Sequence, residues 1–445
     1  MPARGWMKRL RLTAPFAALW LTACNVVDFT RPGTSDPESS YATVYSIYAE
    51  FCALSQIKKK PGFGAEVRGE IGGHAAFYVR GACRSTGSDQ QLLRPCGDPD
   101  AETADGVGIS MNEHFRNAKW VAVPGRELFF NGNLQPGERL TRNRYRALQA
   151  EVQQSGLLDG IEFHPWVFAD MPPGTSTEKY KYEVSVATDY AVGFGRGRYC
   201  ARVAMTRPQL LAMIDFLNAE NAPYRSGRGE FRWSLFQDNC IHLAHNALAA
   251  AGIWSVWPTN RGWLISLLDF PVPKNEFVNL MRRANDAALL NPIAVWQDPA
   301  ARRSVLQFGQ LPVRAGAIAL SRPAHEPNDV YETALKLVFY DEPHLGPYRG
   351  WLEEILADPR RINLERNLAD FATRYRQLRA TRQPLAWWLA QAHLRNAEPA
   401  DAEAFHARFY AALDQGIIDI DRRLAEVRGV RATQHLAAGH RLAAQ

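Results

Sequence analysis

The pattern of apolar and polar positions changes along the chain. Up to about residue 270, segments that alternate like half-buried strands are mixed with segments of helical period. The strand-like segments are 72–83, 106–112, 119–125, 181–188 and 198–205, and the helix-like ones are 41–56, 144–156 and 206–221. This mixture predicts an α+β domain over residues 41–270.

After Pro271 the pattern becomes mainly helical. Segments 311–320 and 334–341 resemble strands, and helical spacing dominates from about Tyr348. The candidate helices are 349–358, 363–380, 385–394 and 402–427. We therefore expect a second region, residues 271–445, that is mainly helical.

The N-terminus has the pattern of a targeting segment. Four basic residues precede an apolar stretch over residues 12–23, which is shorter than the roughly 20 residues needed to span a bilayer. The stretch ends in Leu-Thr-Ala-Cys, which resembles the lipobox of bacterial lipoproteins, where the cysteine is acylated. We predict a signal peptide over 1–23, a lipid on Cys24 and a polar tether over 24–40. An ordinary secretory signal with a chance cysteine is the alternative.

This leader changes the interpretation of the charge. The formal net charge is +6, but four basic residues belong to the predicted signal, which leaves +2 for the mature chain. We therefore predict no nucleic-acid partner. The expected location is the bacterial cell envelope, facing the periplasm, with the lipid as the membrane anchor. Asn25 replaces the aspartate of an inner-membrane retention signal, which favours the outer membrane.

Cysteine usage fits an oxidising compartment. Without Cys24 and Cys240, four cysteines remain, and an even number allows two disulfides in three connectivities. We prefer Cys83–Cys96 across a polar loop, together with Cys52–Cys200, and buried free thiols are the alternative. In the preferred pairing Cys240 is left outside any disulfide.

Cys240 lies at the start of a predicted helix in the segment "FQDNCIHLAHNALAAAGIW". Asp238 or Asn239 would cap the helix, an apolar stripe follows at helical spacing, and Gly252 ends it. The positive end of the helix dipole favours the thiolate of a first-turn cysteine. The N–H groups of that turn would also stabilise an oxyanion on an attacked carbonyl.

The two histidines of this helix are poorly placed to activate Cys240. His242 lies about 200° around the helix from Cys240, and His245 lies about 140° around and one turn further. We expect both on the polar face, exposed or hydrogen-bonded. Their i, i+3 spacing allows a zinc site with Cys240 and a distant ligand, although the glutamate of an HExxH motif is missing. His74, which begins a strand after two glycines, is the better candidate for the base.

The upstream "GGHAAFYV" and the downstream "DNCIHLAHNAL" together resemble the circularly permuted papain-like hydrolases, which include lecithin:retinol acyltransferase-like and NlpC-type proteins. The resemblance covers about residues 41–260. It implies an antiparallel sheet packed against the cysteine helix, with Cys240 as nucleophile and His74 as base. Such sites carry a third polar residue that orients the histidine. Asn112 is our candidate, and Ser110 and Asp189 are alternatives.

These observations predict a cysteine-dependent amide or ester hydrolase, or an acyltransferase, that needs no cofactor and no metal. Cell-wall peptides are the first expected substrate class and lipid or acyl esters the second. The alternative is a non-catalytic envelope lipoprotein that uses the same fold for binding or scaffolding. A cysteine on the apolar side of a helix often serves packing alone.

Overall fold

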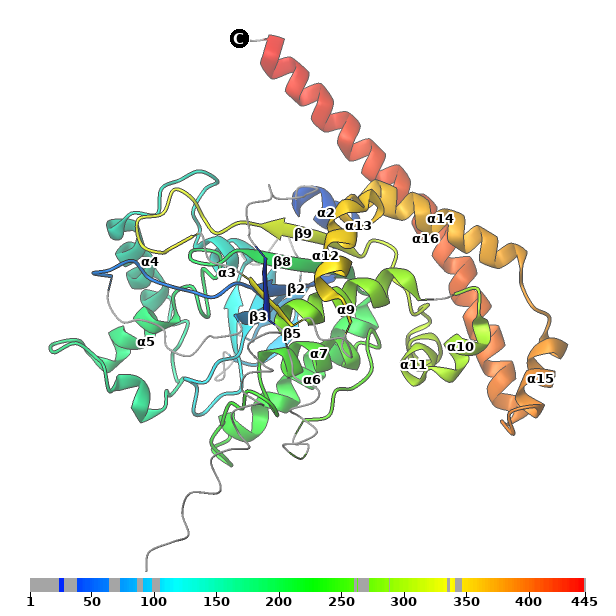
Figure 1. The fold of residues 1–445 in the computed structure, drawn as a ribbon, viewed down its shortest axis with the longest axis horizontal. Helices are drawn as coiled ribbons and strands as arrows, with labels where there is room; N and C mark the ends of the chain where they lie inside the picture. The colour runs from blue at the N-terminus through cyan, green and yellow to red at the C-terminus, as the bar shows by residue number, and fades with distance from the viewer. Residues whose placement is uncertain are drawn as a thin grey trace, which may run out of the picture.

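The computed structural model describes residues 24–27, 38–63, 73–85, 91–97, 105–259, 262, 272–287, 289–333, 337–340 and 346–443. The fold is α+β, as the sequence predicts, and is built around one six-stranded antiparallel sheet (Figure 1). The predicted signal peptide lies outside the described residues, as does most of the tether.

The sheet has the strand order β7-β6-β3-β2-β8-β9, and every neighbouring pair is antiparallel. Its strands are β2 (Tyr48–Leu54), β3 (His74–Arg80), β6 (Gly106–Ser110), β7 (Val121–Pro124), β8 (Arg198–Ala204) and β9 (Ile318–Arg322). Two small sheets pair β4 (Ala82–Arg84) with β5 (Leu93–Pro95) and β1 (Cys24–Val27) with β10 (Leu337–Tyr340).

One face of the sheet is covered by α6 (Arg207–Arg225), α7 (Cys240–Ala250) and α9 (Pro273–Asp286). The ring of Phe277 in α9 stacks on Tyr199 of β8, with 5.9 Å between the ring centres. Because side chains alternate along a strand, Tyr199 and its neighbour Cys200 point to opposite faces. Helix α7 is held to α9 by a hydrogen bond between His245 and Glu276.

The other face of the sheet is covered by α3 (Arg126–Asn131) and the chain that follows it. Gly108 of β6 lies directly under Phe129, and a Cβ at this glycine would lie 2.0 Å from the ring. This close approach explains a glycine in the middle of a buried strand. Helices α4 (Arg142–Gln154) and α5 (Thr177–Ser185) and the 3₁₀ turn Pro165–Phe168 extend this layer.

Two predicted elements have the wrong type. Segment 41–56 was expected to be helical, but it contains the end of α2 (Glu38–Val44) and then β2. All seven residues of β2 are buried, and a continuous apolar strand cannot be distinguished from a buried helix by periodicity. Segment 181–188 was expected to be a strand, but most of it belongs to α5, which Ser176 caps by accepting a hydrogen bond from the Lys179 N–H.

The other elements that the pattern predicts up to residue 225 are confirmed. Strands β3, β6, β7 and β8 and helices α4 and α6 lie where the sequence places them. The capping box predicted for α6 forms between Thr206 and Gln209. Glycine at position 156 ends the α4 region with a φ of +65°, a conformation that glycine adopts readily.

The sheet continues past the predicted boundary at residue 270, because β9 pairs with β8 and α9 packs on β2 and β8. Apart from β10, the other described elements of this region are helices, in line with the expected mainly helical region: α10 (Pro292–Gln297), α11 (Pro299–Phe308), α12 (Tyr348–Ala357), α13 (Pro359–Ile362), α14 (Leu364–Ala380), α15 (Leu385–His393) and α16 (Pro399–Ala443). Helix α16 has 45 residues, and its C-terminal part projects beyond the other elements (Figure 1).

Candidate functional site

Cys240 is the first residue of α7, in the position that the sequence predicts. Asn239 is the N-cap: its Oδ1 accepts hydrogen bonds from the N–H groups of Ile241 (2.9 Å) and His242 (3.3 Å). In return, the Asn239 N–H donates to Nδ1 of His242, which completes a capping box. Cys240 is 8 % exposed, so its side chain is largely enclosed by the protein core next to the capped helix start.

The cap limits the oxyanion site predicted for this turn. Two first-turn N–H groups, those of Ile241 and His242, already donate to the Asn239 side chain. An oxyanion bound there would have to compete with a well-placed internal acceptor.

The two histidines of α7 are hydrogen-bonded, as expected, but they are buried instead of exposed. His245 donates from Nε2 to the Ser255 carbonyl at 2.7 Å, and its Nδ1 is hydrogen-bonded to Glu276. The His242 ring lies 4.9 Å from the ring of Trp257. Since both nitrogens of His245 are occupied, this side chain has no lone pair available for a metal or for the Cys240 proton.

The zinc alternative gains no support from the arrangement. Within the described ranges, the one group of ligand-type side chains close enough to hold an ion is Glu50, Cys52 and Cys200. The two cysteines of that group are joined in a disulfide, so they are not thiolate ligands.

His74 lies at the start of β3, opposite Leu54 of β2. Strand alternation directs it to the face of the sheet that carries Cys52 and Glu50, whereas α7 covers the opposite face. No hydrogen bond joins His74 to Cys240 in the part of the chain that the structure describes, and the Nε2 atom of His74 is buried with no hydrogen-bond partner. Burial, followed by the charge of Arg196, lowers the pKa of His74 to about 3.

The three candidates for the orienting residue lie together. Asp189 accepts hydrogen bonds from Nδ2 of Asn112 (2.6 Å) and from Oγ of Ser110 (2.8 Å), and all three side chains are buried. Oδ1 of Asn112 accepts from the N–H of His114 at 2.7 Å. The β3–β6 pairing ends at Phe77 and Ile109, and continuing its register by three residues would place Asn112 opposite His74.

The structure adds His114, which sequence reasoning missed. Its Nδ1 atom is buried without a hydrogen-bond partner, and burial, followed by the charge of His164, lowers its pKa to about 4. The segment that carries it approaches α7, because Lys119 forms a 2.8 Å ion pair with Asp238, two residues before Cys240. A single histidine shortly after a predicted strand belongs to no recognised motif, so the sequence gives no signal that His114 is functional.

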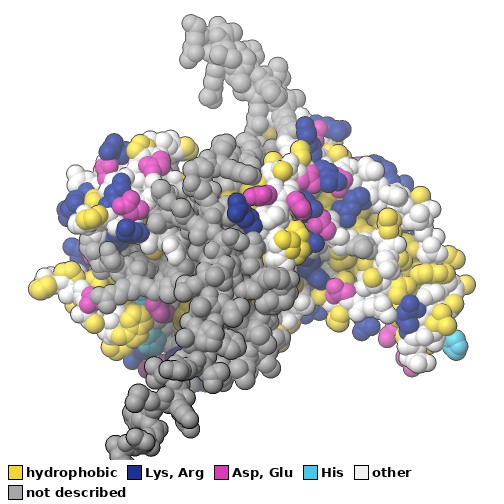
Figure 2. All heavy atoms as spheres, viewed as in Figure 1, with side chains coloured by type: hydrophobic (Ala, Val, Ile, Leu, Met, Phe, Trp, Pro, Cys, Tyr) yellow, Lys and Arg dark blue, Asp and Glu magenta, His cyan; other side chains and the backbone are white. Residues whose placement is uncertain are grey.

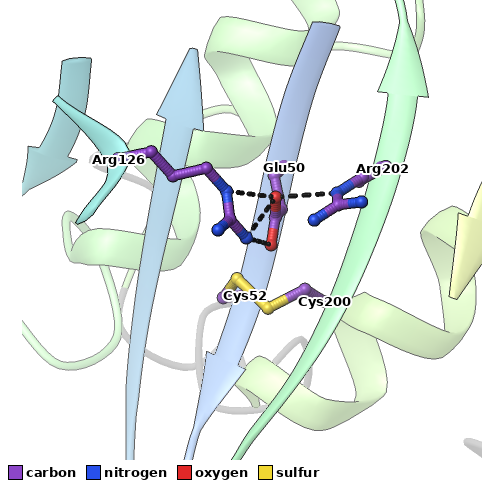
Figure 3. Close-up of a disulfide and its surroundings, with 5 residues drawn as sticks. All are labelled: Glu50, Cys52, Arg126, Cys200 and Arg202. Atoms are coloured by element: carbon purple, nitrogen blue, oxygen red, sulfur yellow. Dashed lines mark hydrogen bonds and ion pairs between the residues drawn. A yellow bond between two sulfur atoms is a disulfide. The ribbon is translucent and has the colours of Figure 1, made fainter. Parts of the chain in front are cut away.

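Both preferred disulfides are confirmed. Cys83–Cys96 joins the ends of the β4–β5 region, and Cys52–Cys200 joins directly opposite residues of β2 and β8. Figure 3 shows that Glu50 lies beside this second disulfide, between Arg126 and Arg202. The Glu50 carboxylate accepts hydrogen bonds of 2.9–3.3 Å from these two guanidinium groups.

A separate hollow of about 550 Å³ lies between α10 and α15. Its lining includes Leu290, Ile293 and Trp387, and hydrophobic side chains gather over this region in Figure 2. Its lining residues include no cysteine, histidine or carboxylate, so it offers no nucleophile or base.

The N-terminal predictions are not addressed by these contacts. The backbone of Cys24 lies in β1, opposite Tyr340, and its acylation stays a prediction. Across the described ranges, no helix combines the length and apolar character that crossing a membrane requires.

Comparison of the chain with protein-family models, with curated proteins and with solved structures gives no match.

Proposed function

We propose that this chain is an envelope lipoprotein with a cysteine-dependent hydrolase or acyltransferase site at Cys240. The observation that carries the proposal is the position of this thiol. Cys240 stays outside both disulfides while the four predicted partners pair, and it occupies the first turn of a capped helix. The helix dipole at that position favours a thiolate.

In the proposed reaction the Cys240 thiolate attacks an amide or ester carbonyl. A C–S bond forms, the C–N or C–O bond breaks, and the leaving group takes the proton that the base removed from the thiol. Water, or a second acceptor in a transferase, then cleaves the thioester and restores the thiol. No cofactor is needed.

The proton acceptor is the second part of the proposal. His74 is the base implied by the permuted papain-like arrangement, with Asn112 as the orienting residue. His114 is the alternative base, because its buried Nδ1 has no hydrogen-bond partner and its segment approaches α7. Catalytic hydrogen bonds are often long before substrate binds, so either histidine would have to move closer to Cys240 in the complex.

The substrate class follows from the predicted location. A lipid on Cys24 would hold the protein at the outer membrane facing the periplasm, where cell-wall peptides are the first candidate and acyl esters the second. The membrane is then a partner through the lipid.

A non-catalytic binding or scaffolding lipoprotein is the second candidate. It is favoured by the Asn239 cap, which occupies two of the first-turn N–H groups that an oxyanion would use. In that case the Cys240 thiol serves packing in the core.

The reactivity of the thiol separates the two functions. The disulfide-intact chain is treated with iodoacetamide between pH 5 and 9, and labelling of the Cys240 peptide is followed by mass spectrometry. A catalytic thiolate should react well below pH 8, and His74→Gln or His114→Gln should remove that low-pH reactivity. Labelling that only follows an ordinary thiol near pH 8.5, unchanged in both variants, would reject the enzyme.

A further inference from the structure

Buried positive charge exceeds buried negative charge on the sheet face that carries the Cys52–Cys200 disulfide. Arg198 and Arg202 are buried there and Arg126 is partly buried, and Figure 3 shows Arg126 and Arg202 on either side of one carboxylate, that of Glu50. The oxygens of Glu50 are hydrogen-bonded to Arg126 and Arg202. The third guanidinium, that of Arg198, forms no hydrogen bond with this carboxylate, and Glu50 and Glu127 attract it only from a longer distance.

The surroundings of Arg198 hold its guanidinium in place without a direct ion pair. Arg198 is 5 % exposed, and in the described part of the chain its side chain forms no hydrogen bond or ion pair. Its Cζ lies 4.7 Å from the centre of the Phe130 ring, as does the Cζ of Arg126. Position 193 is a glycine, and a Cβ there would collide with Nη1 of Arg198. Arg322 of β9 is paired opposite Arg198 and adds another positive charge.

A charge that is buried away from water destabilises the fold unless a counter-charge offsets it. Burial, followed by the charge of Arg126, lowers the pKa of Arg198 to about 9, so the side chain is still protonated at neutral pH. A guanidinium presents five N–H donors in a planar fork, which matches the oxygens of a phosphate or a carboxylate. In the described part of the chain no side-chain hydrogen bond of Arg198 uses these donors, and its Nε is buried without a partner.

We infer that Arg198, with Arg126 and Arg322 beside it, forms a binding site for an oxyanion, either a phosphate or a carboxylate group of a small ligand. Phe130 and Gly193 shape the site, and Glu50 keeps Arg126 in position. The site lies on the opposite face of the sheet from α7, so it does not rest on catalysis by Cys240.

The test is a titration of the full, disulfide-intact chain with inorganic phosphate and, separately, with acetate. Ionic strength is held constant with sodium chloride, because surface charges respond to salt alone. Either anion should raise the melting temperature in a saturable way, as a ligand of the native state does. The anion with the lower Kd by calorimetry identifies the favoured group. If neither anion raises the melting temperature or binds, the inference is overturned.

The variant Arg198→Met keeps an unbranched stem about as long as the aliphatic part of arginine and removes the charge and the donors. We expect at least tenfold weaker binding, whereas Arg349→Met, on exposed α12, should bind like the parent chain. In chloride alone Arg198→Met should melt no lower than the parent, since an uncompensated charge has been removed. Equal binding by the Arg198 variant and the parent contradicts the inference. If Arg198→Met does not fold, Arg198→Lys decides: weaker binding supports the site, and unchanged binding refutes it.

Discussion

Replacing Glu50 by glutamine tests the buried charge cluster at the centre of the sheet. The substitution keeps the size of the side chain but removes the negative charge between Arg126 and Arg202. Glu50 is 1 % exposed, so water cannot replace the lost counter-charge. Both arginines would then be left in the core with a neutral amide as neighbour.

The size of the effect follows from the pKa of the carboxyl group. Burial alone would raise this pKa, but Arg126 and Arg202 outweigh it and lower the pKa from 4.5 to about 2. At about 1.4 kcal/mol per pH unit, this shift corresponds to about 3 kcal/mol of stability. Removing one partner of a buried ion pair typically costs about 3–5 kcal/mol, which agrees with that figure.

The sign of the pH dependence is fixed by the direction of the shift. A carboxyl group with a lowered folded-state pKa stabilises the protein fully above its unfolded pKa, and this contribution is lost as the pH falls from 4.5 toward 2. Glu50→Gln should therefore lower the unfolding free energy by about 3 kcal/mol at pH 7, and its difference from the parent should shrink steadily below pH 4.5.

Urea denaturation at pH 7, 4 and 3, with the disulfides intact, measures both quantities. Glu353→Gln is the control, because that carboxylate is half exposed on α12 and forms only a 3.5 Å surface pair with Arg349. Glu353→Gln should lower the free energy of unfolding by less than about 0.5 kcal/mol. A loss below about 1 kcal/mol for Glu50→Gln, or a loss that does not depend on pH, would show that the Glu50 charge does not stabilise the two arginines.

Two further predictions concern the disulfides and His74. Replacing both Cys52 and Cys200 by alanine should lower the free energy of unfolding by about 5 kcal/mol, because these residues are 148 positions apart. The same change at Cys83 and Cys96, which are 13 positions apart, should lower it by about 3 kcal/mol. Equal losses in urea denaturation would contradict this difference. The pKa of His74 is lowered from 6.5 to about 3 by burial, so the unfolded chain takes up a proton that the folded chain does not, and stability should fall as the pH drops below 6.5. The free energy of unfolding should be about 2 kcal/mol lower at pH 5 than it would be without this shift. In urea titrations, His74→Gln should reduce the difference in unfolding free energy between pH 7 and pH 5 by that amount, and an unchanged difference would contradict the prediction.

Local signals in the sequence predict the elements that satisfy their own hydrogen bonds. The Thr206–Gln209 capping box and the Asn239 cap before Cys240 depend on residues within one turn, so they can be recognised without the rest of the fold. The even number of cysteines predicts two disulfides but leaves three connectivities open, of which the preferred one forms. Strand β2 could not be predicted, because it is buried on both faces and its apolar run carries no period.

The candidate site could be predicted only along the chain, not across the sheet. Alternation shows that His74 and Ala76 share a face, but it does not show which face the cysteine helix covers. That choice depends on α9, whose residues Phe277 and Glu276 hold the helical layer on the opposite side. The cluster around Asp189 needs a contact between residues 77 positions apart, which no local pattern records.

The pairing of β9 with β8 has a consequence for the order in which the chain assembles. In a chain that is exported from its N-terminus, the first five strands of the sheet and both halves of the Cys52–Cys200 bridge are available once residue 204 has emerged. The outer edge of β8 has no partner until residues 318–322 follow, and an open strand edge readily pairs with another chain. A fragment that stops at residue 270 would keep this edge open permanently and lose α9 from the helical layer, so self-association is its expected fate.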